Sequence, residues 1–276
     1  MMKPNQVTLL RRLIIPLLQK FNLGDITIRH HWTNDKFTLH SFKHKEYWYQ
    51  GKKRKLETML LFSALIKEGD YVIEIGGHIG YISLYLAHLV GPKGRITVFE
   101  PGPDNLPYLQ KNTAADPRIS LVKKAVTDYV GTAKLYIDKL TGQNNSLIAD
   151  YRILKENKKL DYIDSGDASF IEVSCTTLDN FLNQVQAIFP SFVKIDVEGA
   201  EFHVLNGMRE TLKTKDLALM VEVHENLEEV FLLLRDSGFL MFDPKRNPIE
   251  DAKDVRGNIF CIKGNDDRME VFSHRY

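Results

Sequence analysis

The stretch YVIEIGGHIG, residues 71–80, decides the fold of this chain. Its first five residues are apolar apart from Glu74 and rich in β-branched side chains, which predicts a buried strand. Gly76, Gly77 and Gly80 carry no Cβ, so the turn after this strand can be tight and its backbone can approach a ligand closely. The apolar residues 81–89 predict a helix whose first amides point into the same space. This strand–turn–helix order is typical of a doubly wound sheet that binds a nucleotide-like cofactor at the carboxyl ends of its strands.

Two acidic residues indicate which cofactor this turn binds. Glu100 ends the next predicted strand, RITVFE, twenty residues after Gly80. A carboxylate at this place can accept a hydrogen bond from each of two ribose hydroxyls. Glu74 lies two positions before the first glycine, where an acid disfavours a diphosphate and suits a cofactor that carries an ammonium and a sulfonium. His78 stands where a dinucleotide would need the closest backbone approach. The pattern therefore predicts S-adenosylmethionine, with NAD as the alternative cofactor.

Four blocks of sequence resemble, in order and spacing, the FkbM family of methyltransferases: EIGGHIG at residues 74–80, FEP at 99–101, KIDVEGAE at 194–201 and VEVH at 221–224. The resemblance begins near Leu56, and KIDVEGAE is its most specific block. The family usually has Asp where Glu74 stands and Ala where Gly77 stands, and neither difference removes a needed group. The resemblance implies a Rossmann-like methyltransferase fold. It also implies, most often, methylation of an oxygen on a sugar, lipid or secondary metabolite, without implying which one.

The composition is that of a soluble globular protein. The 276 residues are 43% apolar and 26% charged, and no run approaches the roughly 20 apolar residues of a membrane span. The apolar residues 13–18 are broken by Pro16 and precede no small-residue cleavage site, so they make a poor signal peptide. Cys175 and Cys261 lie in strand-like runs without a metal-type spacing, which favours reduced thiols. We therefore expect a cytoplasmic protein.

Residues 1–55 are predicted to form an extension ahead of a methyltransferase domain that spans residues 56–276. Residues 1–60 carry a net charge of +8, which leaves −7 for the remainder of the chain. Such a split marks contact with a membrane surface or an anionic substrate, or simply a solvated basic face. Residues 7–23 suggest a helix that is interrupted near Pro16. This helix either lies at a membrane interface, as a peripheral contact, or packs on the catalytic domain or on a second subunit of a homodimer.

Two further parts of the extension carry readable patterns. Residues 25–42 alternate well enough to predict a β-hairpin with Asn34 and Asp35 in its turn. Residues 42–56, FKHKEYWYQGKKRKL, contain six basic and four aromatic residues. This composition suits an anionic or sugar-like acceptor, and equally a surface linker that covers the cofactor end of the sheet. Aromatic residues among lysines also bind nucleic acid. The chain lacks the motifs of enzymes that methylate the amino groups or carbons of bases, so nucleic acid is not an expected partner.

From residue 56 onward strands and helices alternate, as a parallel sheet with crossover helices requires. The first helix, residues 56–67, is expected to bury a face made of Leu56, Met59, Leu60 and Ala64. After the two strands already described, further strands of a seven-stranded sheet are predicted at residues 119–123, 191–195, 217–223, 239–242 and 258–262. The last two are expected to close the sheet as an antiparallel edge pair. The predicted class is therefore α/β, with a mostly parallel sheet and helices on both faces.

Three segments are expected to serve the cofactor edge of this sheet. Ala125 and Val126 follow the third strand, at a place that commonly lies beside an adenine, where small and apolar side chains leave room for a flat ring. Residues 131–137 predict an inserted strand. Residues 141–166 are polar, and their length suits a mobile lid or acceptor loop, or mere decoration of the surface.

The chemistry is predicted at the ends of the fourth and fifth strands, because methyl transfer needs an acceptor oxygen held in line with the methyl group and a group that takes its proton. Asp196, Glu198, Glu222 and His224 are the candidates. His224 is the best general base by its intrinsic pKa. Asp196 is expected to orient this histidine, to bind the ammonium of the cofactor or to act on the acceptor. Glu198 acts beside them or only favours the dipole of the next helix. These groups are also hard-ion ligands, but they show no recognisable metal spacing, so no metal is predicted.

The predicted catalytic residues are thus Asp196, His224 and Glu198. The predicted cofactor-binding residues are Glu74, Gly76, Gly77, His78, Gly80, Tyr81, Glu100, Pro101, Ala125, Val126 and Asp196. Together they predict an S-adenosylmethionine-dependent O-methyltransferase whose partner is a small-molecule, glycan or lipid acceptor. Two alternatives are a non-catalytic cofactor-binding subunit of a biosynthetic complex and an NAD-dependent oxidoreductase.

Overall fold

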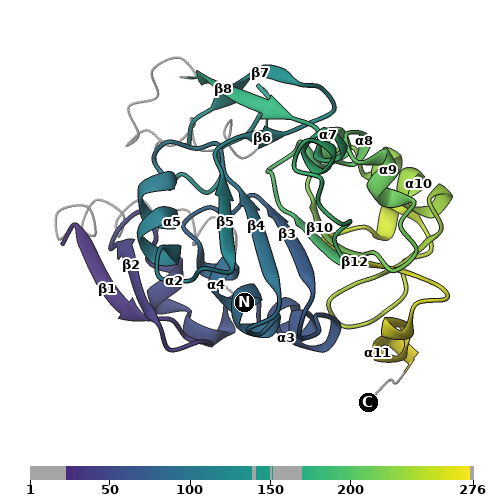
Figure 1. Ribbon diagram of the computed structural model, residues 1–276, viewed down its shortest axis with the longest axis horizontal. Coiled ribbons are helices and arrows are strands. Elements are labelled where there is room, and N and C mark those ends of the chain that lie inside the picture. The colour runs from purple at the N-terminus through teal and green to yellow at the C-terminus, as the bar shows by residue number, and fades with distance from the viewer. Residues whose placement is uncertain (1–22, 139–140, 150, 152–169, 274–276) are drawn as a thin grey trace, which may run out of the picture.

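The structure is a computed structural model that describes residues 23–138, 141–149, 151 and 170–273. Its central element is a seven-stranded sheet in the order β11-β12-β10-β9-β3-β4-β5 (Figure 1). Its strands are β3 (Tyr71–Ile75), β4 (Arg95–Phe99), β5 (Ile119–Val122), β9 (Phe192–Ile195), β10 (Ala218–Val223), β11 (Phe239–Phe242) and β12 (Gly257–Lys263). The predicted Rossmann-like sheet is therefore confirmed.

Parallel pairing runs through the five strands from β5 to β10. β12 pairs antiparallel with both β10 and β11, which confirms the predicted antiparallel edge. From β3 the chain first builds outward through β4 and β5, and it then returns to add β9 on the other side of β3. The crevice beyond the carboxyl ends of β3 and β9 is thus a topological switch point, where sheets of this kind bind their ligands.

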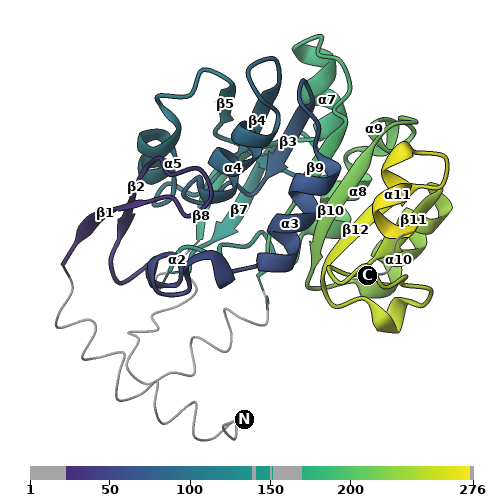
Figure 2. The ribbon, with the colours of Figure 1, turned by 90° about the horizontal axis from the view of Figure 1, so that it is seen from below.

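Helices cover both faces of the sheet (Figures 1 and 2). One face is covered by α3 (Leu56–Leu65), α4 (Tyr81–Leu89), α5 (Leu106–Thr113) and α11 (Glu270–Ser273). The other face is covered by α7 (Leu178–Gln184), α8 (Glu201–Asn206), α9 (Arg209–Leu212) and α10 (Leu227–Asp236). Alternate residues of β3 serve the two faces: Val72 lies in the first apolar cluster, whereas Ile73 and Ile75 lie in the second. Because β3 is buried on both faces, its residues are apolar on both, with Glu74 as the exception.

The predicted hairpin of the extension is confirmed. It consists of β1 (Asp25–Arg29) and β2 (Lys36–His40), which pair antiparallel, and Asn34 adopts a left-handed conformation in the turn, with φ of 64°. Phe37 of β2 is fully buried in the same apolar cluster as Tyr81 of α4. The side chain of Asn112 in α5 binds both backbone groups of Thr38. The hairpin therefore shares the core of the domain, while the boundary at residue 55 stays a prediction.

A second, three-stranded sheet stands at the edge of the domain, in the order β6-β8-β7. Its strands are β6 (Ala125–Val126), β7 (Gly131–Tyr136) and β8 (Phe170–Thr176). β7 pairs antiparallel with β8, and β6 pairs parallel with β8. The inserted strand predicted at residues 131–137 is thus confirmed. It belongs to this small sheet, at the top of Figure 1, and not to the central one.

The predicted buried face of α3 was wrong in part. Met59 is buried, as expected, but Leu56 and Leu60 are 41% and 49% exposed, and Ala64 is exposed as well. Phe62 and Leu65 are fully buried in their place. Apolar residues occur all round this helix, so its periodicity does not select one face, and packing against the sheet decides instead.

Two predicted segments fall wholly or largely outside the described residues: the helix at residues 7–23 and the lid at residues 141–166. Within the part that is described, no helix is long and apolar enough to cross a membrane. Between β2 and α3 the chain forms α2 (Lys45–Tyr49) and one turn of 3-10 helix at Gly51–Lys53. The basic and aromatic stretch of the sequence therefore lies directly before α3.

Candidate active site

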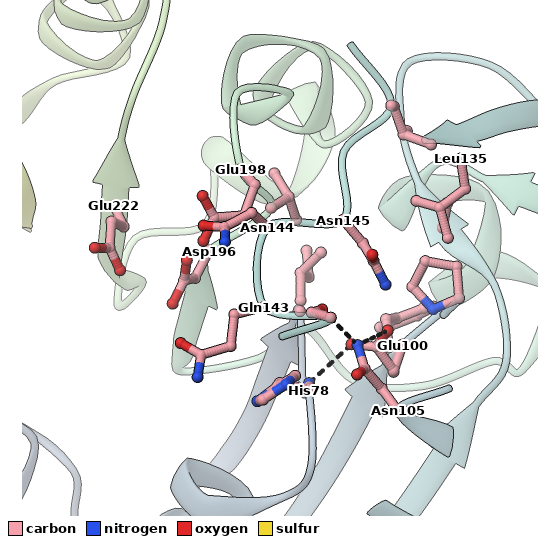
Figure 3. A pocket seen from close by; sticks show the side chains of 18 of the residues that line it. His78, Glu100, Asn105, Leu135, Gln143, Asn144, Asn145, Asp196, Glu198 and Glu222 are labelled. Atoms are coloured by element: carbon pink, nitrogen blue, oxygen red, sulfur yellow. Dashed lines mark hydrogen bonds between the residues drawn. The ribbon is translucent and has the colours of Figure 1, made fainter. Parts of the chain in front are cut away.

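A cavity of about 280 Å³ opens at the carboxyl edge of the central sheet, at the switch point (Figure 3). Most of the predicted site residues line it: Gly76, His78, Glu100, Pro101, Ala125, Val126, Asp196, Glu198, Glu222 and His224. Figure 3 shows Glu100 and Asn105 at one end, Asp196, Glu198 and Glu222 at the other, and His78 between them. The sequence thus located the site, although four predicted cofactor-binding residues do not line the cavity: Glu74, Gly77, Gly80 and Tyr81.

Glu74 lies one layer behind the cavity. Its side chain is 1% exposed, and it accepts a hydrogen bond from the hydroxyl of Ser83 in α4. Lys194 places its Nζ 3.5 Å from Oε1 of Glu74. Burial raises the pKa of Glu74, and Lys194 opposes this shift. In this structure the acid therefore contacts α4 and Lys194, and Lys194 in turn donates a hydrogen bond to the backbone oxygen of Gly76 in the turn.

The glycines of the turn are required mainly by contacts within the protein. A Cβ at Gly76 would lie 1.9 Å from the backbone oxygen of Asp196, and φ of Gly76 is +88°. A Cβ at Gly77 would lie 2.2 Å from Cγ1 of Val98. The absent side chains let the turn pack directly onto β4 and onto the end of β9. The sequence predicted that these glycines leave room for a ligand, whereas in the structure Gly76 and Gly77 leave room for neighbouring strands.

Glu100 closes one end of the cavity. Its carboxylate accepts hydrogen bonds from the backbone N–H groups of His78 and Gly102, both at 2.8 Å, and from Nδ2 of Asn105 at 3.2 Å. Burial raises the pKa of Glu100 to about 7, although these three donors oppose the shift. Two carboxylate oxygens have about four acceptor sites in total, so Glu100 keeps acceptor capacity for a ligand.

An apolar slot adjoins Glu100. It is walled by Phe99, Ala125, Val126, Leu135 and Leu147. Asn145 borders the slot, and its Nδ2 is buried without a hydrogen-bond partner. Apolar walls with one free polar edge suit a flat heterocyclic ring.

The other end of the cavity is highly charged. Oδ2 of Asp196 lies 3.3 Å from Nζ of Lys55 and 3.5 Å from Nζ of Lys194, and Lys55 also forms an ion pair with Glu222. Burial alone would raise the pKa of Asp196, but the two lysines hold it well below its usual value. Burial and the neighbouring charge of Asp196 raise the pKa of Glu222. Asp196 is therefore a permanent anion and a poor proton acceptor.

His224 and Glu198 form a second charged group beside it. Nδ1 of His224 lies 3.1 Å from Oε1 of the fully buried Glu201, and its Nε2 lies 3.5 Å from Oε2 of Glu198. Burial lowers the pKa of His224, but the bond to Glu201 and the charge of Glu198 outweigh it and raise the pKa to about 9. Burial and the charge of Asp196 raise the pKa of Glu198 to about 8. His224 therefore carries a proton at neutral pH, which changes the base role expected from its intrinsic pKa.

Backbone strain also concentrates at this cavity. Lys55, His78 and Glu198 line it, and all three adopt the left-handed region, with φ of 50°, 47° and 56°. They are three of the seven non-glycine residues with positive φ in the described chain. Such conformations cost about 1–3 kcal/mol each and persist where the surrounding structure enforces them, often at functional sites.

Several residues of the site could not be recognised from the sequence. Lys55 and Arg54 line the cavity and end the basic run before α3, which was predicted to contact an acceptor or to cover the cofactor end without singling out either residue. Lys194 opens the block KIDVEGAE, which served only as a mark of the family. Tyr151 donates a hydrogen bond from its hydroxyl to Oε2 of Glu198. Tyr151 lies in the polar segment proposed as a lid, and nothing in that pattern marked it. Tyr47, from α2, also lines the cavity and contacts Nδ1 of His78 at 2.9 Å.

The four residues that could bind a hard metal ion all line the charged end of the cavity: Asp196, Glu198, Glu222 and His224. In the described part of the chain, however, no three His, Cys, Asp or Glu side chains are arranged to hold a metal ion. The ammonium of Lys55 lies against Asp196 and Glu222, where a cation would have to bind.

The comparisons with known proteins agree with this geometry. A family model described as the methyltransferase FkbM domain matches residues 74–242, more than half of the chain. The chain belongs to the FkbM methyltransferase family. The matched FkbM domain runs from the end of β3 to β11 and contains every acid of the cavity except Glu46. Arg54, Lys55 and Tyr47 come from the segment before it.

Individual relatives are distant. Methyltransferase sdnD of Sordaria araneosa is 27% identical over 216 residues, which cover 69% of this chain and 80% of that protein. The 31-O-demethyl-FK506 methyltransferase FkbM of Streptomyces tacrolimicus is 28% identical over 195 residues, which cover 63% of this chain and 74% of that protein. Among solved structures, the methyltransferase FkbM of Methylobacillus flagellatus is 15% identical, with a TM-score of 0.46. That match covers 72% of this chain and 47% of the other chain.

Proposed function

We propose that this member of the FkbM family transfers a methyl group from S-adenosylmethionine to a hydroxyl oxygen of a small-molecule, glycan or lipid acceptor. The observation that carries the proposal is a single cavity with two chemically distinct ends. One end joins an apolar slot to the acceptor capacity of Glu100, and the other holds a cluster of acids, lysines and a histidine. When bound, S-adenosylmethionine supplies an electrophilic methyl group.

The cavity contains polar atoms that fit this cofactor. Glu100 keeps about one acceptor site for a ribose hydroxyl, and the slot beside it suits the adenine ring. Nδ2 of Asn145 and Nε2 of His78 are buried without partners, and both belong to residues that line the cavity. Buried polar groups without partners cost about 1–3 kcal/mol each, so these atoms favour a polar ligand in the cavity.

The acids at the other end have separate roles. Asp196 stays ionised, and it places a fixed negative charge where the cofactor's positive groups would lie. Glu198 is the group best matched to take the proton of the acceptor hydroxyl, because its pKa of about 8 lies near neutrality. Tyr151 and His224 hold its carboxyl group. The imidazolium of His224 would stabilise the negative charge that develops on the acceptor oxygen.

Oxygen as the methylated atom is supported by this acid–base pair, since an alcohol must lose a proton as it is methylated. The relative from Streptomyces tacrolimicus supports the same atom, because its name describes a substrate that lacks an O-methyl group. The test is to incubate the protein with methyl-labelled S-adenosylmethionine and a panel of hydroxylated glycans, lipids and polyketides, and to identify the product by mass spectrometry and NMR. An O-methyl ether is expected from the wild type and not from Glu198→Gln. A methylated nitrogen or carbon would contradict the proposal.

The acceptor is proposed to enter past α2, where Trp48 and Tyr49 are 42% and 61% exposed beside several lysines. A cytoplasmic location remains a prediction of the sequence. Contact with a membrane and formation of a homodimer also remain predictions, because they depend on the segment at residues 7–22, which lies outside the described residues.

A further inference from the structure

We propose that Arg54 binds the carboxylate of the cofactor's methionyl end, assisted by His78; this inference rests on the proposed function. Arg54 lines the cavity from the segment between α2 and α3. Its guanidinium carbon lies 4.2 Å from the ring centroid of Tyr47, so a cation–π contact fixes its position. Its Nε is buried and has no hydrogen-bond partner.

The other cations at this end are already neutralised. Lys55 pairs with Asp196 and Glu222. Lys194 donates to the backbone oxygen of Gly76 at 2.6 Å and lies beside Glu74. Among the described residues, Arg54 makes no ion pair. The charges of Tyr47, Glu46 and Asp196 keep Arg54 protonated, but its buried Nε–H has no acceptor. A bound carboxylate would accept from this Nε–H and from a second N–H of the guanidinium in the matching bidentate geometry.

A second unpartnered donor lies in the same corner. Nδ1 of His78 is 2.9 Å from the hydroxyl of Tyr47, and the Nε2 of His78 is buried without a partner. Burial lowers the pKa of His78 well below its usual value, so the ring is neutral. When Nδ1 accepts a hydrogen bond from the Tyr47 hydroxyl, the ring hydrogen of the neutral histidine is on Nε2, which can then donate a hydrogen bond. Arg54 and His78 therefore flank Tyr47 with two free donors, and a carboxylate has two oxygens to accept them.

The position of this corner favours the cofactor over the acceptor as the source of the carboxylate. The backbone N–H of His78 donates to Glu100, where the ribose is proposed to bind, while its side chain reaches Tyr47 and thus the Arg54 corner. One residue of the glycine turn therefore connects the ribose end to this corner. Asp196, whose charge acts on both Arg54 and His78, supplies the negative charge that the neighbouring ammonium needs.

The test compares two ligands that differ only in the carboxylate, S-adenosylmethionine and decarboxylated S-adenosylmethionine, by calorimetric titration. The wild type is expected to bind the decarboxylated ligand about 10- to 100-fold more weakly, as for a lost charge-assisted hydrogen bond. Arg54→Gln should weaken the binding of S-adenosylmethionine by a similar factor and leave the affinity for the decarboxylated ligand unchanged. The unchanged affinity also shows that the variant is folded. Arg54→Lys should keep part of the preference. Lys124→Gln, which removes a cavity cation beside Ala125, should leave the ratio of the two affinities unaltered.

Equal binding of the two ligands by the wild type would overturn the assignment of Arg54. The assignment would also be overturned if Arg54→Gln and Arg54→Lys lowered the affinities for both ligands by equal factors, because Arg54 would then act only on the shape of the cavity. If the wild type binds neither ligand, the cofactor assignment itself fails and the role of Arg54 fails with it.

Discussion

Glu198 and His224 lie 3.5 Å apart at the charged end of the cavity, and each changes the protonation of the other. Intrinsic pKa values made His224 the expected base, whereas the shifted pKa values of the two groups favour Glu198 for that role. No sequence pattern shows that Glu201 is fully buried against Nδ1 of His224, and this contact keeps the imidazole charged. The residues could be predicted from the sequence, whereas their protonation states depend on partners that only the fold brings together.

We predict a bell-shaped dependence of kcat/KM on pH. The pKa of Glu198 is raised to about 8, so its basic form appears as the pH rises through that value. The pKa of His224 is raised to about 9, so its imidazolium is lost above that value. Activity should therefore be highest between the two. Glu198→Gln should lower kcat by about 10²–10⁴-fold, and His224→Gln should remove the alkaline limb. These assignments would be contradicted if the acid limb of kcat/KM lay at the pH of an ordinary carboxylate pKa, well below neutrality.

Lys55 is predicted to stabilise the protein by separating two acids. Lys55→Met leaves Asp196 and Glu222 without the ammonium between them, and breaking such a partly buried group should lower the free energy of unfolding by about 3 kcal/mol. Adding Glu222→Gln should restore much of this loss, because it removes one of the two negative charges. Thermal and urea unfolding of the single and double variants measure the coupling. Additive losses in the double variant would show that Lys55 acts through packing alone.

At the scale of single elements, the glycine turn between β3 and α4 fixes the distance between the two ends of the cavity. The sequence predicted the strand, the turn and the helix, because β-branched runs and glycines carry strong local signals. It did not predict the buried face of α3, where apolar residues occur all round the helix. It also did not predict that the turn packs onto Asp196 and Val98, because these contacts join segments far apart in the chain.

Gly76→Ala is predicted to destabilise the protein by more than backbone strain explains. Gly69 is the matched control: its φ is +90°, against +88° at Gly76, but a Cβ there would meet nothing within 4 Å. Gly69→Ala should therefore cost only the left-handed strain, about 1–2 kcal/mol. Gly76→Ala must also displace the carbonyl of Asp196, and we expect a loss of at least about 3 kcal/mol together with weaker cofactor binding. Equal losses at the two positions in urea unfolding would disprove the packing role.

At the scale of the whole molecule, the hairpin of the extension and the central domain share one apolar cluster. Composition and charge separated residues 1–55 from the rest, since the basic residues gather there. The distribution of charged residues describes the surface of the protein, and it does not show which apolar side chains are buried in the core. Phe37 and Tyr47 of the extension both pack with Tyr81 at the start of α4, so the extension also supports the wall of the cavity.

Phe37→Ala is predicted to lower the free energy of unfolding by about 3–5 kcal/mol, as for a phenylalanine lost from a core. Unfolding should remain a single transition, because the hairpin and the domain form one cooperative unit. Phe189→Ala is the control, since Phe189 is 48% exposed, and its loss should stay below about 1 kcal/mol. A separate low-temperature transition in Phe37→Ala, with the main one unchanged, would mean that the hairpin folds independently.

The central claim is that the cavity binds S-adenosylmethionine with Glu100 on the ribose. The most direct measurement is calorimetric titration of the wild type and of Glu100→Ala with S-adenosylmethionine, S-adenosylhomocysteine and NAD. We predict that the wild type binds the first two and not NAD, that Glu100→Ala binds none of them, and that Glu100→Gln retains the fold with weakened binding. Binding of NAD alone, or undiminished binding of S-adenosylmethionine by Glu100→Ala, would contradict the claim.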